Sequence, residues 1–110
     1  MIFVTGPLFA GKREYIRKAL GLREEELAAR AVWDVQELAH GADLAALAEA
    51  LAQKEIVIAT EIGGGLIPTD PAEREKREAA GRLACLLAER ADTVIRVCCG
   101  LGQVLKGELP

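Results

Sequence analysis

Residues Gly6 to Arg13 are the part of the sequence whose types and spacing most directly suggest chemistry. The stretch reads Gly6-Pro7-Leu8-Phe9-Ala10-Gly11-Lys12-Arg13. The spacing Gly-x-x-x-x-Gly-Lys is that of a phosphate-binding loop, in which backbone N–H groups surround phosphate oxygens and the lysine reaches the β- and γ-phosphates. A helix that starts here would add its positive end. We therefore predict that residues 6–13 bind a nucleotide and that Lys12 takes part in catalysis.

Arg13 departs from the motif, which has serine or threonine after the lysine. That hydroxyl is the usual Mg²⁺ ligand, whereas a guanidinium cannot coordinate a cation and would repel one. We expect Arg13 to supply a fixed positive charge near the phosphates, so that binding depends little on Mg²⁺. In the alternative, Gly6 and Gly11 only form a tight turn, and Lys12 and Arg13 are exposed.

Two acidic residues stand at the ends of predicted strands. Asp34 and Glu61 are candidates for catalysis and for Mg²⁺ binding, because the carboxyl ends of strands are where α/β sheets bind ligands. A lone aspartate at a strand end is also a common turn residue, which is the simpler interpretation of Asp34. His40, the only histidine, is most simply a surface loop residue.

Downstream of Glu61, two further groups could contact a ligand. Gly63-Gly64-Gly65 before Pro68 would allow positive φ angles and close approach of the backbone, or would only be a flexible connection. Arg74 and Arg77 lie about one helical turn apart and are candidates to bind phosphate or substrate. They could equally belong to a solvated helix face that also carries glutamates.

The strands that must position these residues are predicted from apolar runs. Residues 2–5 stop at Gly6, and Ile56–Thr60 begins with the nearly continuous apolar run of a parallel strand covered on both faces. We predict these two as inner strands of a parallel sheet. Further strands are predicted over residues 31–35, 93–99 and 103–106.

Helical segments alternate with the strands. We predict helices over Lys12–Leu20, closed by Gly21, over residues 23–30, from the cap Asp43 to about residue 53, and from Asp70-Pro71 to about residue 90. The alternation predicts an α/β fold of the P-loop type (RecA-like), with a mostly parallel sheet and flanking helices in a shortened form. We expect residues 1–110 to form a single domain.

Composition limits the partners. Fourteen basic and 17 acidic residues give a net charge of −3, which offers no broad attraction for nucleic acid or an anionic membrane. No apolar stretch approaches the ~20 residues that span a bilayer, so we expect a cytoplasmic protein. Cys85, Cys98 and Cys99 have poor spacing for disulfides or zinc, and we expect buried, reduced thiols.

The segment after Ile56–Thr60 resembles the cobinamide kinase/cobinamide-phosphate guanylyltransferase family of cobalamin biosynthesis. The family signature runs E-V-G-x-G-I-V-P, R-x-F-R-D-x-x-G-R and A-D-x-V. Here the matching stretches are Glu61-Ile62-Gly63-Gly64-Gly65-Leu66-Ile67-Pro68, then Arg74, Arg77-Glu78 and Gly81-Arg82, and Ala91-Asp92. The similarity covers residues 56–106 and the first 20 residues. The region between them is much shorter than in the family, and the family's guanylylated histidine has no counterpart.

The resemblance implies a nucleotide-binding protein that uses GTP or ATP, with a corrinoid substrate. It implies phosphoryl transfer to the hydroxyl of adenosylcobinamide; guanylyl transfer is not carried over. Family members assemble as oligomers, so we expect a homo-oligomer. Two alternatives stay open: a catalytically degenerate binding or regulatory homologue, and a structural homologue whose glycine loop binds nothing and whose apolar helix faces serve self-association.

Overall fold

The computed structural model describes residues 1–62 and 70–110. The predicted glycine stretch Gly63-Gly64-Gly65 and Pro68 lie outside the described residues. The elements, in chain order, are β1 (Ile2–Gly6), α1 (Lys12–Leu20), α2 (Glu24–Arg30), β2 (Ala31–Val32), the 3₁₀ helix η1 (Val35–Leu38), α3 (Leu44–Leu51), β3 (Ile56–Thr60), α4 (Pro71–Arg90), β4 (Thr93–Cys98) and β5 (Leu101–Lys106).

The strands form one sheet in the order β2-β3-β1-β4-β5. β1 pairs in parallel with β3 on one side and with β4 on the other, and β2 pairs in parallel with β3. Only β5 runs antiparallel, against β4. The predicted α/β fold with a mostly parallel sheet is therefore confirmed, with β1 and β3 as inner strands.

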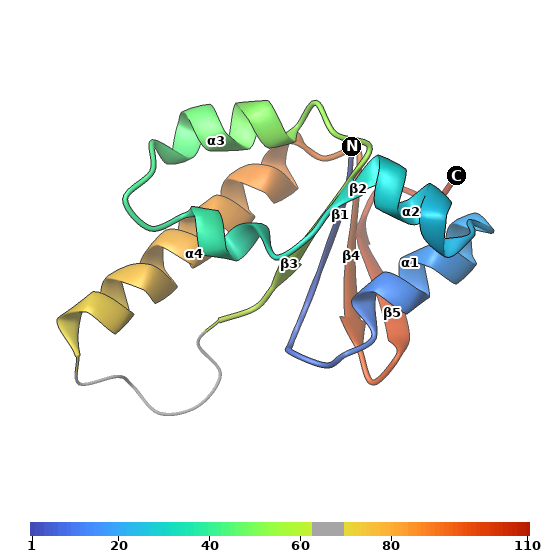
Figure 1. Cartoon of the computed structure of the whole chain (residues 1–110), viewed down its shortest axis with the longest axis horizontal. Coiled ribbons are helices and arrows are strands. Elements are labelled where there is room, and N and C mark those ends of the chain that lie inside the picture. Colours follow the sequence, from blue (N-terminus) through green and yellow to red (C-terminus); the bar gives the residue numbers. More distant parts are fainter. Residues whose placement is uncertain (63–69) are drawn as a thin grey trace.

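Helices cover both faces of this sheet, α3 and α4 on one side and α1 and α2 on the other (Figure 1). Successive side chains of a strand point to opposite faces, and the buried residues divide accordingly. Phe3 belongs to the cluster under α3 and α4, whereas its neighbour Val4 belongs to the cluster under α1 and α2. Small and aliphatic side chains thus build two cores that share the strands.

The helix ends follow the predicted capping residues. Asp43 accepts a hydrogen bond from Ala46 N at 3.2 Å, and Asp70 accepts one from Ala72 N at 2.9 Å. Gly21 closes α1 in the left-handed conformation, with φ 66°. Helix α3 ends at Leu51, two residues earlier than expected.

The second predicted strand is largely wrong. Only Ala31–Val32 is extended, and Asp34 takes a left-handed conformation with φ 56° that breaks the strand. Val35 then begins η1 and is buried in the cluster under α3 and α4. The physical reason is that Val35 gains more from packing against these helices than from continuing a strand at the sheet edge.

The expectation of buried cysteines is also wrong. Cys85, Cys98 and Cys99 are free thiols, as predicted, but all three are exposed. Cys98 ends β4, and Cys99 lies in the turn to β5 with φ 54°. A strand end and a turn do not bury their side chains, although the local sequence is apolar.

Across the described residues, no helix combines the length and the apolarity needed to cross a membrane.

Candidate functional site

The glycine loop joins β1 to α1 and is fixed at both ends by backbone contacts. A Cβ built on Gly6 would meet the Val97 carbonyl oxygen at 2.1 Å, so the chain passes β4 too closely for a side chain. Gly11 has φ 85° at the start of α1, and Gly100 N donates to Ala10 O at 2.8 Å. The loop is thus held at the carboxyl edge of the sheet, where α/β folds bind ligands.

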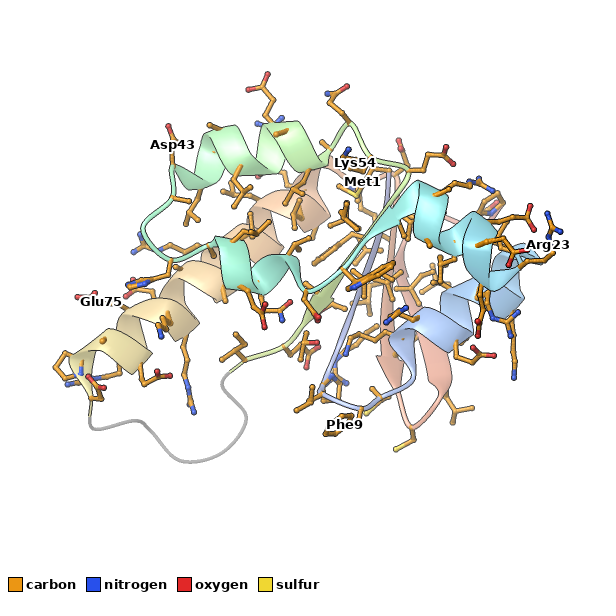
Figure 2. The ribbon with its side chains drawn as sticks, viewed as in Figure 1. Met1, Phe9, Arg23, Asp43, Lys54 and Glu75 are labelled. Atoms are coloured by element: carbon orange, nitrogen blue, oxygen red, sulfur yellow. The ribbon has the colours of Figure 1, made fainter. Side chains whose placement is uncertain are left out.

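At the tip of the loop, two apolar side chains face outward. Leu8 is 65% exposed and Phe9 is 94% exposed, and Phe9 points away from the sheet (Figure 2). An exposed phenylalanine at the mouth of a loop gives no stability to the isolated fold. It is available for contact with a ligand or with another surface.

Lys12 lies inside the loop rather than on the surface. Its side chain is buried, at 8% exposure, and its Nζ donates to Pro7 O at 2.7 Å. Burial lowers the pKa of Lys12, and the carboxylates of Asp34 and Glu61 oppose that effect. Lys12 is therefore not exposed, contrary to the simple-turn alternative, whereas Arg13 is exposed, as that alternative expects.

A cavity of about 270 Å³ opens beside the loop. Besides the loop residues Leu8, Phe9, Ala10 and Gly11, it is lined by Lys12, Arg13, Trp33, Asp34, Ile58 and Thr60. We call it the loop pocket. It brings together three of the predicted functional side chains, Lys12 and Arg13 at the start of α1 and Asp34 after β2.

Trp33 is a lining residue that the sequence analysis did not identify. The guanidinium carbon of Arg13 lies 4.1 Å from the centroid of the Trp33 ring, which is a cation–π contact. Trp33 is the only tryptophan in the chain and directly precedes the candidate Asp34. This position could have identified it from the sequence as a residue of the site. The contact orients Arg13 along the wall of the pocket.

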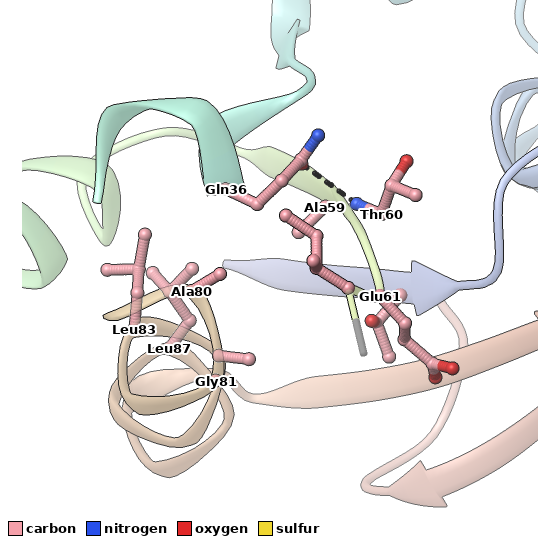
Figure 3. Close-up of a pocket in the computed structure, with 11 residues that line it drawn as sticks. Gln36, Ala59, Thr60, Glu61, Ala80, Gly81, Leu83 and Leu87 are labelled. Carbon is pink, nitrogen blue, oxygen red and sulfur yellow. Dashed lines mark hydrogen bonds between the residues drawn. The ribbon is translucent and has the colours of Figure 1, made fainter. Parts of the chain in front are cut away.

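Glu61 lies at the end of β3 but outside the loop pocket. It contributes to a neighbouring cavity of about 110 Å³ between the end of β3, η1 and α4, whose described lining also includes Gln36, Ala80, Leu83 and Leu87. Gln36 Oε1 accepts a hydrogen bond from Thr60 N at 2.9 Å, and Glu61 extends away from the apolar side chains of α4 (Figure 3). Thr60 lines both cavities.

The carboxylate of Glu61 is paired with Arg96, a second residue missed from the sequence. Arg96 Nε donates to Glu61 Oε1 at 2.7 Å, and Arg96 Nη2 donates to Glu61 Oε2 at 2.9 Å. This bidentate geometry is the strongest form of an arginine–carboxylate pair. The Glu61 carboxylate raises the pKa of Arg96.

Other predicted residues lie apart from the loop pocket. Arg74 and Arg77 belong to the first two turns of α4 and are not among the described residues that line either cavity. The Nε2 atom of His40 lies 3.8 Å from Oε2 of Glu75, a residue of α4. The structure therefore does not bring these side chains to the glycine loop.

The residues present do not form an ordinary Mg²⁺ site, because Asp34 is the sole carboxylate among the described residues that line the loop pocket. Arg13 stands where the metal-binding hydroxyl would be, and both oxygens of Glu61 accept from Arg96. In the described part of the chain, no three His, Cys, Asp or Glu side chains are grouped closely enough to hold a metal ion. The charged groups that this site offers to an anion are its own cations, Lys12 and Arg13.

One family of known proteins matches most of the chain. The sequence model of the family described as cobinamide kinase / cobinamide phosphate guanyltransferase matches residues 19–105. The matched range includes Asp34, Glu61, Arg74 and Arg77, whereas the glycine loop precedes it. Among curated proteins, none matches the chain.

Proposed function

Because the chain belongs to the cobinamide kinase / cobinamide phosphate guanyltransferase family, we propose that it binds the phosphates of GTP or ATP in the loop pocket and acts in cobalamin biosynthesis. The observation that supports this most directly is the buried Lys12, held by Pro7 O inside a glycine loop at the carboxyl edge of the sheet. Burying an ammonium group under a glycine loop costs desolvation free energy, and a bound anion would offset that cost.

Arg13 is the second cation of the proposed phosphate site. The cation–π contact with Trp33 limits the positions of its guanidinium, so less entropy is lost when it contacts a phosphate. In this proposal, Lys12 and Arg13 neutralise the phosphates, and the loop N–H groups give directional hydrogen bonds. Arg74 and Arg77 remain proposed contacts to phosphate or substrate only if α4 or the ligand brings them near.

Calorimetric titration with GTP and ATP, each with MgCl₂ and with EDTA, tests this proposal. We expect binding in both conditions, with affinities that differ by less than about threefold, because the site carries its own cations. An Arg13→Ser variant should lose affinity without metal. If neither nucleotide binds at millimolar concentration, the proposal is wrong and the structural homologue remains.

A second candidate function is phosphoryl transfer to the hydroxyl of a cobinamide-type corrinoid. Asp34 favours it, because this carboxylate lines the same pocket as Lys12, where it can accept the proton of an attacking hydroxyl. The test is incubation with cobinamide and nucleotide, followed by mass analysis for a phosphate ester. Binding without product would favour the degenerate binding or regulatory homologue.

We also propose a homo-oligomer, as expected from the resemblance. The large exposed apolar side chains of the described residues lie on the glycine loop and on β5, with Leu38 and Ile62 besides, rather than on the faces of α3 and α4 that pack into the core. Light scattering after size-exclusion chromatography would measure the assembly, and a monomer at high concentration would contradict it.

A further inference from the structure

Arg96 is a charged residue in an inner strand, and its position next to the glycine loop is unusual. It belongs to β4 and stands opposite Thr5 of β1, the residue before Gly6. Inner strands of parallel sheets are ordinarily apolar throughout, and the neighbours Ile95 and Val97 are fully buried. An arginine at this register position therefore needs a reason.

The partner of Arg96 supplies that reason. Glu61 follows β3, and its N donates to Gly6 O at 2.8 Å, so its backbone is joined to the first residue of the loop. Both carboxylate oxygens accept from the guanidinium of Arg96, at 2.7 and 2.9 Å. The ion pair thus crosses the end of β1 and links the two strands that flank it.

Besides Asp34, which lines the loop pocket itself, Glu61 is an acid that a cation at this edge of the sheet could use. It follows the strand next to β1, whereas Asp34 follows β2, which is one strand further away. A carboxylate bound in bidentate fashion by a guanidinium has its charge neutralised and its oxygens directed to the N–H groups. A divalent ion at these oxygens would be repelled by the positive charge of Arg96.

We propose that Arg96 determines which ligand this site binds. By pairing with Glu61, Arg96 prevents that carboxylate from binding a divalent metal ion, so the pocket selects a polyphosphate without bound metal. This rests on the proposed binding of nucleotide phosphates at the loop. With Lys12 and Arg13, Arg96 is the third cation at this edge, and Glu61 holds it in place beside the loop. Arg96 is a positioning and specificity residue in this proposal, because it acts through Glu61.

The first test measures metal binding directly and needs no nucleotide. Mn²⁺ is titrated into the protein, and free Mn²⁺ is followed by its electron paramagnetic resonance signal. We expect the Arg96→Leu variant to bind Mn²⁺ at least tenfold more tightly than the unchanged chain, because Glu61 is released. Equal affinity of both proteins would overturn the proposal.

The matched control is Arg30→Leu. Arg30 forms an ion pair with Glu55, Nε to Oε2 at 2.6 Å, at the opposite end of β3, and its side chain is 43% exposed compared with 41% for Arg96. It therefore loses a comparable pair far from the loop. A gain of Mn²⁺ affinity in this control as large as that of Arg96→Leu would also contradict the assignment to Glu61.

A second variant acts on the other partner and keeps the test decisive if Arg96→Leu does not fold. In Glu61→Gln, Arg96 is released and a negative charge that acts on Lys12 is removed, so affinity for inorganic tripolyphosphate in EDTA should rise about threefold or more. If Glu61 were a metal ligand, the same change would instead weaken binding in MgCl₂ and leave binding in EDTA unchanged.

The two proposals fail in different ways. If the unchanged chain binds neither nucleotide nor tripolyphosphate, the proposed function is wrong, while the Mn²⁺ titration still decides the role of Arg96. If the chain binds GTP and the Arg96→Leu variant gains no Mn²⁺ affinity, the role of Arg96 is wrong and the nucleotide site stands.

Discussion

Lys12 combines a positive charge with burial, and these two properties conflict. Desolvation lowers its pKa, and the carboxylates of Asp34 and Glu61 counteract this effect. A methionine in its place would fill similar space without a charge that must be solvated. The residue is therefore better explained by ligand binding than by stability.

The Lys12→Met variant tests this explanation. We expect its affinity for GTP or tripolyphosphate to fall about 10- to 150-fold, because a charge-assisted contact to phosphate contributes roughly 1.5–3 kcal/mol. Its melting temperature should remain near that of the unchanged chain. Calorimetry gives the affinity, and emission of the single Trp33 in the same pocket gives an independent signal. Unchanged affinity would show that the phosphate lies elsewhere.

The sequence indicated side chains that share one pocket, but not the contacts between distant segments, and the roles of these side chains in binding stay predictions. Lys12, Arg13 and Asp34 were identified from motif spacing and strand ends, and the structure brings them to one pocket. The pair of Glu61 and Arg96 joins residues 35 positions apart. Arg96 was read only as part of a strand, because nothing local shows which face or which partner it has.

At the scale of the elements, the glycine loop depends on how closely β1 approaches β4. A Cβ added at Gly6 would clash with the backbone of Val97, which cannot move without breaking the sheet. A Cβ added at Gly102 would lie 2.1 Å from Cζ of the Tyr15 ring, but this side chain can rotate away. The two glycines therefore differ in whether the neighbouring atoms can move to make room for a side chain.

This difference predicts that alanine at the two positions lowers the free energy of unfolding by different amounts. Gly6→Ala should lower the free energy of unfolding by about 3 kcal/mol or more, because overpacking here distorts backbone, whereas Gly102→Ala should lower it by about 1–2 kcal/mol. Urea unfolding measures both. The argument fails if Gly102→Ala is the more destabilised variant.

Helix α2 offers a test of capping through pH. The Glu26 side chain accepts from Arg23 N at 3.0 Å, and this bond together with the Arg23 side chain lowers the pKa of Glu26 below its ordinary 4.5. A carboxyl group whose pKa is lower in the folded chain stabilises that chain above its unfolded pKa. The contribution is lost as the pH falls through the folded value.

Glu26→Gln should therefore lower the melting temperature at pH 7, and the difference from the unchanged chain should shrink as the pH falls below 4.5. Glu49→Gln, a change at an exposed position of α3, is the control and should show little effect at either pH. A constant difference for Glu26→Gln across the range would mean that its charge does not contribute.

Local signals located most elements because caps, glycines and apolar runs act within a few residues. Asp43, Asp70 and Gly21 ended or began helices where expected. The strand over residues 31–35 was predicted too long because β propensity cannot register that Val35 packs under α3 and α4. The exposed Cys98 and Cys99 show the same limit, since an apolar run at a strand end resembles an apolar run inside a strand.

At the scale of the whole molecule, the two hydrophobic clusters are separated by the sheet and joined through it. Phe3, Val57 and Val94 face one cluster, and the next residue of each strand faces the other. Loss of either layer would expose one face of the same strands. The residues of the loop pocket depend on both layers, because Trp33 packs with the cluster under α1 and α2 and Asp34 precedes Val35 of the other.

We therefore expect residues 1–110 to unfold as one cooperative domain. Trp33 fluorescence reports the layer of α1 and α2, and far-ultraviolet ellipticity reports mainly α4, the longest helix at 20 residues, in the other layer. The two signals should give one midpoint in urea, as two-state unfolding requires. Tripolyphosphate at about 100 times its dissociation constant should shift both by the same free energy, roughly 2.7 kcal/mol. Separate midpoints, or a shift in Trp33 emission alone, would show that the layers unfold independently and that the ligand is held by only one of them.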